Sequence, residues 1–138
     1  MAKKHRTAFQ FKEWAIDLYE PATIEEIQQV EKELQIVLPK VYKGLLSVSN
    51  GVHGNLVQLY STDGLIEMNK TYEVQNYAPG YVSVGNDNGG YHLLMRAVED
   101  AVNFQLVSDG YGVPTENDTT DNFLSWLNSE EGDPWRNE

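Results

Sequence analysis

The sequence contains no cysteine, and this absence excludes disulfide bonds and thiolate metal sites. The lack of thiols is typical of proteins in a reducing compartment, so we expect a cytoplasmic location. No apolar run approaches the ~20 residues that a membrane-spanning helix needs. The first residues carry positive charge but no apolar segment follows them, which argues against a secretory signal. We therefore expect a protein that does not enter a membrane.

Histidines are also scarce, and they show no metal-binding pattern. The three histidines, at positions 5, 53 and 92, include no pair with the i, i+4 spacing of helical zinc sites. The sequence has no G-x-S-x-G nucleophile motif. The run Gly85–Gly90 lacks the Lys-Ser/Thr pair of a phosphate-binding loop, so we interpret it as a hairpin turn. We expect no enzymatic activity, cofactor or metal; the enzymatic alternative is a cleft where His53 and His92 meet a carboxylate.

Basic residues are few. Ten Lys and Arg stand against 21 Asp and Glu, which gives a formal net charge of −11 at pH 7. Such a field repels phosphate backbones and attracts basic partners, so we expect no binding to nucleic acid. The alternative is that the acidic balance serves solubility alone.

Two helices are predicted in the first half of the chain. Thr23 and Glu26 fit a capping box, and apolar residues follow at helical spacing. Proline is tolerated in the first turn of a helix, so Pro39 predicts a second helix over residues 39–49. Asn50-Gly51 is predicted to end that helix, because both residues accept the left-handed conformation.

The rest of the chain is dominated by strand patterns. Asn, Asp and Gly at positions 86–90 favour the positive φ angles of a tight hairpin. Residues 61–64 are predicted to form a turn, and residues 65–77 suit either a helix or an irregular connection. A last helix is expected to begin at Asp118 or Thr119 and to end near Ser129. Strands are predicted over residues 56–60, 81–85, 91–95 and 104–107.

These elements indicate an α+β fold. It has two N-terminal helices, a mainly antiparallel sheet of about four to six strands, and a C-terminal helix. The length suits one domain, which we place at residues 23–129. Residues 1–22 are expected to pack on the domain as a lead-in segment, as an edge strand or a short helix. Residues 130–138 are expected to form a loose acidic tail.

Aromatic side chains are abundant, with eight tyrosines and three tryptophans. Tyrosine buries a large area at low entropic cost and is enriched at interfaces, so these residues predict an aromatic-rich partner surface. The alternative is that half or more of them complete the core with their hydroxyls at its rim. The tyrosines on predicted strands and loops are Tyr60, Tyr77, Tyr81, Tyr91 and Tyr111.

The order of the motifs resembles the signature of the SUKH superfamily. Its pattern is a helix with an internal Glu (Glu31), then Leu38-Pro39, then a helix containing an aromatic residue (Tyr42), then Asn50-Gly51. The Gly89-Gly90 hairpin and the closing helix around Trp126 are similar to later elements of the superfamily. The resemblance covers residues 23–128. It implies an α+β domain without catalytic residues that binds proteins.

The resemblance implies two alternative functions. Many superfamily members are immunity proteins, so the first is neutralisation of a cognate bacterial toxin by direct binding in the cytoplasm. The acidic charge suits a basic toxin domain. For this function we predict a partner surface of Asp87, Asn88 and Tyr91 at the hairpin, with Asp109 and Tyr111 in the later loop. The alternative is an intracellular regulatory or scaffolding protein, like the yeast cell-wall synthesis regulator, without a toxin partner.

Overall fold

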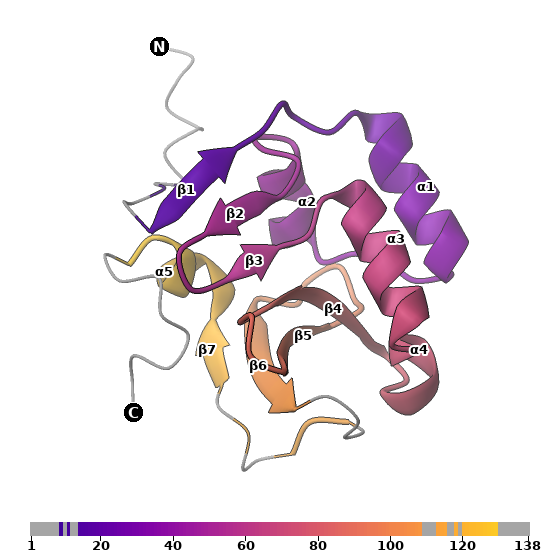
Figure 1. The fold of residues 1–138 in the computed structure, drawn as a ribbon. Coiled ribbons are helices and arrows are strands. Elements are labelled where there is room, and N and C mark those ends of the chain that lie inside the picture. The colour runs from indigo at the N-terminus through magenta and orange to yellow at the C-terminus, as the bar shows by residue number, and fades with distance from the viewer. Residues whose placement is uncertain are drawn as a thin grey trace.

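The computed structural model describes residues 9, 11, 14–108, 113–115, 118 and 120–129. Figure 1 shows the arrangement of its helices and strands, with α1, α2 and α3 beside one another and β4–β6 beneath them. In chain order the elements are β1 (Ala15–Leu18), α1 (Ile24–Leu34), α2 (Lys40–Leu46), β2 (Val52–Gly54), β3 (Gln58–Leu59), α3 (Thr62–Thr71), α4 (Val74–Tyr77), β4 (Tyr81–Asn86), β5 (Tyr91–Arg96), β6 (Asn103–Ser108), β7 (Thr120–Asn122) and α5 (Phe123–Leu127).

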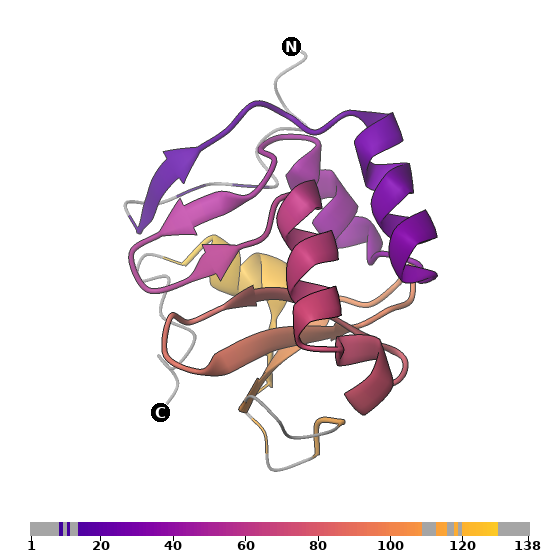
Figure 2. The same cartoon turned by 45° about the vertical axis from the view of Figure 1, so that its right-hand side comes forward.

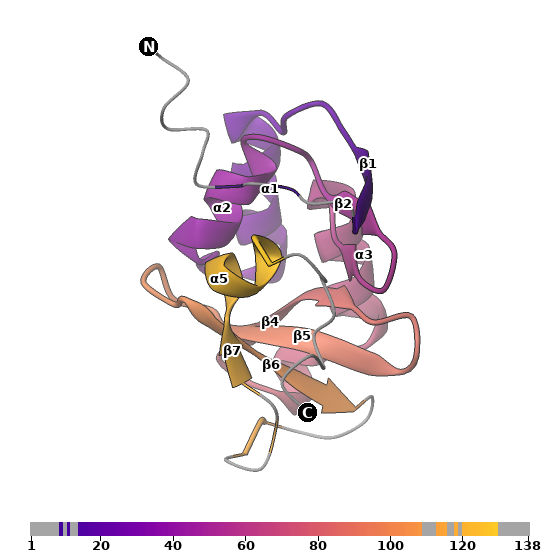
Figure 3. The same cartoon turned by 90° about the vertical axis from the view of Figure 1, so that its left-hand side faces the viewer.

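The strands of the described residues form one antiparallel sheet in sequence order, from β1 to β7. An α+β fold is confirmed, but the predicted four to six strands are too few, because the described residues contain seven. The extra strands are short: β2 and β7 have three residues each, too few to give a clear alternating pattern. The sheet curls, so that β1–β3 and β4–β6 run in different directions (Figures 1 and 3).

Helix α1 begins as the sequence predicts. Thr23 Oγ1 accepts a hydrogen bond from the Glu26 N–H at 3.1 Å, and Glu26 Oε1 accepts one from the Thr23 N–H at 2.9 Å. This reciprocal pair satisfies two backbone donors at the helix start. The helix ends at Gln35, which has a left-handed φ of 55° although it is not a glycine. The buried face consists of Ile27, Val30 and Leu34.

Helix α2 begins directly after Pro39, as predicted, but it ends at Leu46 rather than near residue 49. Its C-cap, Ser47, is right-handed, so the prediction that Asn50-Gly51 ends the helix is wrong. A turn follows in which the Val48 N–H donates to the Leu45 carbonyl. Gly51 instead supplies a φ of 94° immediately before β2.

Residues 61–64 start a helix, and the predicted turn there is wrong. Ser61 Oγ accepts from the Gly64 N–H at 3.1 Å and caps α3. Asn50 also stabilises the N-terminal end of α3, because its Oδ1 accepts a hydrogen bond from the Thr62 N–H at 2.8 Å. Helices α3 and α4 occupy most of residues 65–77, which decides that ambiguous segment in favour of helix. Figure 2 shows α3 passing in front of the strands at the centre of the view, with α4 continuing from its lower end.

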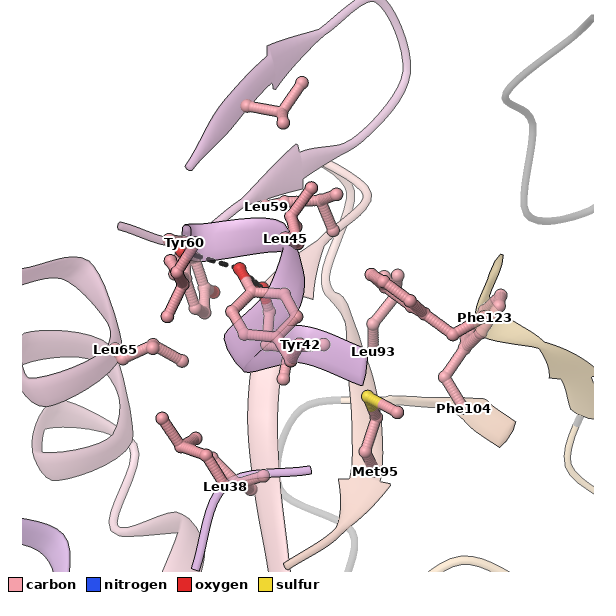
Figure 4. Packing of buried hydrophobic residues seen from close by; sticks show 14 of the residues in the cluster. Leu38, Tyr42, Leu45, Leu59, Tyr60, Leu65, Leu93, Met95, Phe104 and Phe123 are labelled. Carbon is pink, nitrogen blue, oxygen red and sulfur yellow. Dashed lines mark hydrogen bonds between the residues drawn. The ribbon is translucent and has the colours of Figure 1, made fainter. Parts of the chain in front are cut away.

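The main core lies between the helices and the inner face of the sheet (Figure 4). Tyr42 is fully buried there, and its hydroxyl donates to the Tyr60 carbonyl oxygen at 2.5 Å and lies 3.2 Å from that of Val84. Burial raises the pKa of Tyr42 well above its ordinary value, and Tyr60 adds a smaller increase. A second, smaller cluster packs on the opposite face of the sheet and consists of Val74, Ala78, Leu94 and Val107.

Helix α5 starts later than predicted. Residues 120–122 pair with β6 as strand β7, so a helix beginning at Asp118 or Thr119 is wrong. Asn122 is the N-cap, and its Oδ1 accepts from the Ser125 N–H at 2.9 Å.

Trp126 on α5 is fully buried and joins the lead-in to the core. Its ring centroid lies 5.3 Å from that of Trp14 and 5.2 Å from that of Phe104. Trp14 Nε1 in turn donates to the Leu127 carbonyl at 3.1 Å. Residues 14–18 therefore lie against the domain, with β1 as an edge strand of the sheet.

Candidate protein-binding surface

The β4–β5 hairpin is held in shape by Asp87. Its Oδ1 accepts hydrogen bonds from the Gly89 N–H at 2.8 Å and the Tyr91 N–H at 3.1 Å. Asn88 and Gly90 take φ angles of 64° and 98°, as the turn prediction expects. The Asp87 carboxylate therefore has a structural role in the loop, in addition to any contact with a partner.

A cavity of about 250 Å³ lies between this hairpin and helix α3. Tyr60, Tyr72 and Tyr91 contribute to its lining, together with Met68 from α3. Tyr72 and Tyr91 are 40% and 37% exposed, so their rings reach solvent at the cavity rim. Tyr60 is almost fully buried, and its hydroxyl accepts a hydrogen bond from Asn86 Nδ2 at 2.9 Å.

His92 lies beneath the rim. It is 8% exposed, and its Nδ1 is 3.2 Å from Ser83 Oγ. Its ring packs edge-on against Tyr72, with 4.7 Å between the ring centroids. These contacts give the histidine a packing and hydrogen-bonding role in positioning Tyr72.

A buried carboxamide fixes α3 to the sheet. Asn69 is 1% exposed, and its Nδ2 donates to the carbonyls of Leu65 (2.8 Å) and Ser83 (2.9 Å). Its Oδ1 accepts from the Ser83 N–H at 2.9 Å and from Gln75 Nε2 at 3.1 Å. All four hydrogen-bonding positions of the carboxamide are used. The helix wall of the cavity is therefore attached rigidly to the strand wall.

The structure brings together three of the five residues predicted to bind a partner. Asp87, Asn88 and Tyr91 share the hairpin, and the last two line the cavity. Asp109 and Tyr111 lie outside the described residues. The predicted set lacks Tyr72, because the pattern of residues 65–77 suits either a helix or an irregular connection. The spacing of Leu65, Met68 and Tyr72 is the signal for this helix, of which Tyr72 is the C-cap.

The two described histidines do not share a cavity. His53 is exposed in β2 and lines an open cleft of about 600 Å³ with Tyr19 and Glu20. His92 lines the cavity beside the hairpin. Over the described ranges there is no group of three His, Cys, Asp or Glu side chains suited to a metal ion. The helices of those ranges are also too short and too polar to cross a membrane.

The motif residues of the N-terminal half have structural roles. Glu31 Oε2 accepts from the Leu38 N–H at 2.8 Å and lies 3.3 Å from Lys43 Nζ. This carboxylate joins α1 to the Leu38-Pro39 junction and to α2. Tyr42 joins α2 to the sheet through its hydroxyl, and Asn50 joins the following loop to α3.

Comparison with known sequences agrees with this arrangement. The sequence model of the SMI1 / KNR4 family (SUKH-1) matches residues 21–129, which include all five helices and every strand but β1. The chain belongs to this family. A relative is YnaB of Bacillus subtilis (strain 168), a protein described as uncharacterised. It is 32% identical over an alignment of 102 residues, and the match covers 61% of this chain and 69% of YnaB.

Membership in the SMI1/KNR4 family confirms the resemblance drawn from Glu31, Leu38-Pro39 and Asn50-Gly51. The match begins just before α1, so β1 and Trp14 precede it. In this SMI1/KNR4 member, the segment before the matched region adds a strand to the sheet and a side chain to the core.

Proposed function

We propose that this SMI1/KNR4 domain is a non-enzymatic protein-binding module that acts as an immunity protein in the cytoplasm. It binds a cognate toxin domain through the β4–β5 hairpin and the adjoining helix α3. The observation that carries the proposal is the cavity between these elements, with Tyr72 and Tyr91 half-exposed at its rim. Aromatic side chains in such a position are typical of the residues that dominate binding energy at interfaces.

Electrostatics supports a basic partner. The whole chain carries a formal charge of −11. The two segments that form the cavity, residues 60–73 and 86–92, contain four carboxylates and one lysine. That lysine, Lys70, is already paired with Glu33 at 2.9 Å. Complementary charge accelerates association and disfavours wrong partners. The carboxylates are Asp63, Glu67, Glu73 and Asp87.

Rigidity of the surface also supports binding. The Asn69 carboxamide ties α3 to β4, and the Asp87 carboxylate fixes the hairpin loop. A surface that is ordered before binding loses less conformational entropy on association. The hairpin and α3 therefore suit a tight, specific complex.

The test is binding to the toxin domain encoded beside the gene for this chain. Calorimetry should give a complex with the wild type and at least about tenfold weaker binding for Tyr91→Ala, which corresponds to about 1.4 kcal/mol. Tyr19→Ala is the matched control, because Tyr19 is 50% exposed and lies beside β1. Coexpression should also rescue cells from the toxin. Undiminished killing together with no complex on size exclusion would reject the immunity function.

The second candidate is a regulatory or scaffolding domain of the cell-wall-regulator type. The observation that favours it is the match itself, since the SMI1/KNR4 family model covers the domain from α1 to α5. Under this function the same hairpin surface binds a host protein. A pull-down from the native host that recovers a host protein in a Tyr91-dependent manner, with no binding to any toxin domain, would select this alternative.

A further inference from the structure

We propose that the cavity between the β4–β5 hairpin and α3 is a binding site for an arginine side chain of the protein partner. This inference rests on the proposed protein-binding function and specifies what the surface recognises. The cavity has a volume of about 250 Å³, enough for a guanidinium group and the end of its aliphatic stem.

The walls of the cavity suit a flat cation. Three aromatic residues line it from separate places in the chain: Tyr60 directly follows β3, Tyr72 is the C-cap of α3, and Tyr91 begins β5. Aromatic faces attract cations through their quadrupole, and the planar guanidinium also stacks on them. Met68 offers a polarisable apolar contact for the methylene groups of the stem.

The hairpin supplies polar groups beside these rings. Asn86 and Asn88 both line the cavity. Asn86 Oδ1 accepts from the Asn88 N–H at 2.9 Å and retains a second lone pair. The Asn88 carboxamide lies in the exposed part of the loop and has no hydrogen bond to a described residue. Amide oxygens in this position can accept hydrogen bonds from the fork of guanidinium N–H groups.

Local charge favours a cation over a neutral or acidic side chain. Asp87 anchors the hairpin loop, and Glu67 and Glu73 directly precede and follow the lining residues Met68 and Tyr72 in the sequence. The neighbouring Lys70 is neutralised by Glu33. Arginine is preferred to lysine because a compact ammonium group can neither stack on the rings nor donate through a planar fork.

The experiment uses N-acetyl-arginine-N-methylamide as the probe and the full chain labelled for heteronuclear NMR. Titration should shift the backbone amides of residues 86–92 and 68–72 in a saturable manner. The citrulline analogue is nearly isosteric but neutral, and it should bind about tenfold more weakly. The lysine analogue should fall between the two.

Two variants localise the probe. Tyr72→Leu and Tyr91→Leu keep apolar bulk but remove one ring each, and each should weaken probe binding several-fold. Tyr77→Leu is the matched control, because Tyr77 is 56% exposed and does not line this cavity. The dispersion of each variant's amide spectrum verifies folding independently of binding.

The outcomes separate this site from the proposed function. Equal shifts with the arginine and citrulline probes, or binding unaffected by both Tyr→Leu variants, would overturn the arginine site even if a toxin complex forms. Preference for a phenylalanine analogue would also overturn it, in favour of an apolar anchor. Conversely, saturable arginine-selective binding supports the site even if the toxin domain tested fails to bind.

Discussion

The carboxylate of Glu31 accepts a hydrogen bond from the backbone N–H of Leu38 at 2.8 Å. The bond spans seven residues and joins the body of α1 to the position before Pro39. The same oxygen lies 3.3 Å from Lys43 Nζ on α2. One side chain thus sets the relation between two helices, which explains physically why an internal Glu and a Leu-Pro pair occur together in this chain.

Replacement of Glu31 by alanine should lower the free energy of unfolding by about 2 kcal/mol, because a part-buried backbone donor loses a charged acceptor. Glu31→Gln should cost less, since an amide oxygen can still accept the bond. Glu33→Ala is the control: Glu33 forms an exposed ion pair with Lys70, and such pairs contribute little to stability. Urea denaturation measures all three variants, and equal losses for Glu31→Ala and Glu33→Ala would contradict the role of Glu31.

Asn69→Ala should destabilise the protein by about 3 kcal/mol or more. The substitution leaves the Ser83 N–H and two backbone carbonyls without their side-chain partner in a buried site. Asn76→Ala is the matched control on neighbouring α4, because its Nδ2 makes only an exposed 3.5 Å contact with Glu73. Thermal unfolding should therefore separate the two variants clearly. A loss below about 1 kcal/mol for Asn69→Ala would show that the carboxamide does not fasten α3 to β4.

The features that the sequence predicts correctly are local ones. The capping box of Thr23 and Glu26 and the hairpin over residues 86–90 depend on residues within five positions of one another. Their side chains and φ preferences act within the segment itself. The family can likewise be predicted from the sequence, because the resemblance depends on the order of a few short motifs such as Leu38-Pro39 and Asn50-Gly51.

The sequence predicts a turn where helix α3 begins and does not decide between a helix and an irregular connection for the rest, because the support for α3 comes from elsewhere in the chain. It contains Gly64 and Asn69, which are weak helix formers. Its start is reinforced by Asn50, twelve residues upstream, and the buried Asn69 is satisfied by the backbone of β4. Only the folded arrangement shows these partners. The cavity was missed for the same reason, since α3 forms one of its walls.

Gly51→Ala should be more destabilising than Gly90→Ala. Both glycines have left-handed φ angles, 94° and 98°, so both substitutions cost about 1–2 kcal/mol of backbone strain. A Cβ at Gly51 would also lie 2.9 Å from the Ser61 nitrogen and 3.0 Å from the Leu59 oxygen, whereas one at Gly90 meets no atom within 4 Å. The difference in unfolding free energy isolates this steric contribution. Equal costs would mean that the loop around Gly51 relaxes freely.

Gln35→Gly should stabilise the protein by about 1 kcal/mol. Gln35 ends α1 with a φ of 55°, a conformation that glycine adopts without steric cost. Gln28→Gly is the matched control within the same helix, where glycine should cost about 1 kcal/mol. Chemical denaturation should therefore show that the same Gln→Gly substitution raises the free energy of unfolding at position 35 and lowers it at position 28. A loss of stability for both variants would indicate that the Gln35 side chain makes a contribution larger than the strain.

The buried tyrosine predicts how stability depends on alkaline pH. Burial, and to a smaller extent Tyr60, raises the pKa of Tyr42 in the folded state. The folded form then holds the Tyr42 proton more tightly than the unfolded form. The full contribution of protonated Tyr42 to the free energy of unfolding is therefore present below the unfolded pKa of about 10. Above that pH, stability falls by about 1.4 kcal/mol per pH unit until the folded pKa is reached.

Tyr42→Phe should separate the two effects of the hydroxyl. At pH 7 the variant should be less stable by about 1–2 kcal/mol, because the hydrogen bond to the Tyr60 carbonyl is lost. Above pH 10 the unfolding free energy of the variant should fall less steeply with pH than that of the wild type. The two slopes should differ by the linkage of one proton, about 1.4 kcal/mol per pH unit. Tyr77→Phe is the control, since Tyr77 is exposed and the Tyr42 hydrogen bond remains in that variant. If all three proteins show one slope between pH 9 and 12, the linkage assigned to Tyr42 is wrong, because no other change distinguishes the phenylalanine variant from the wild type.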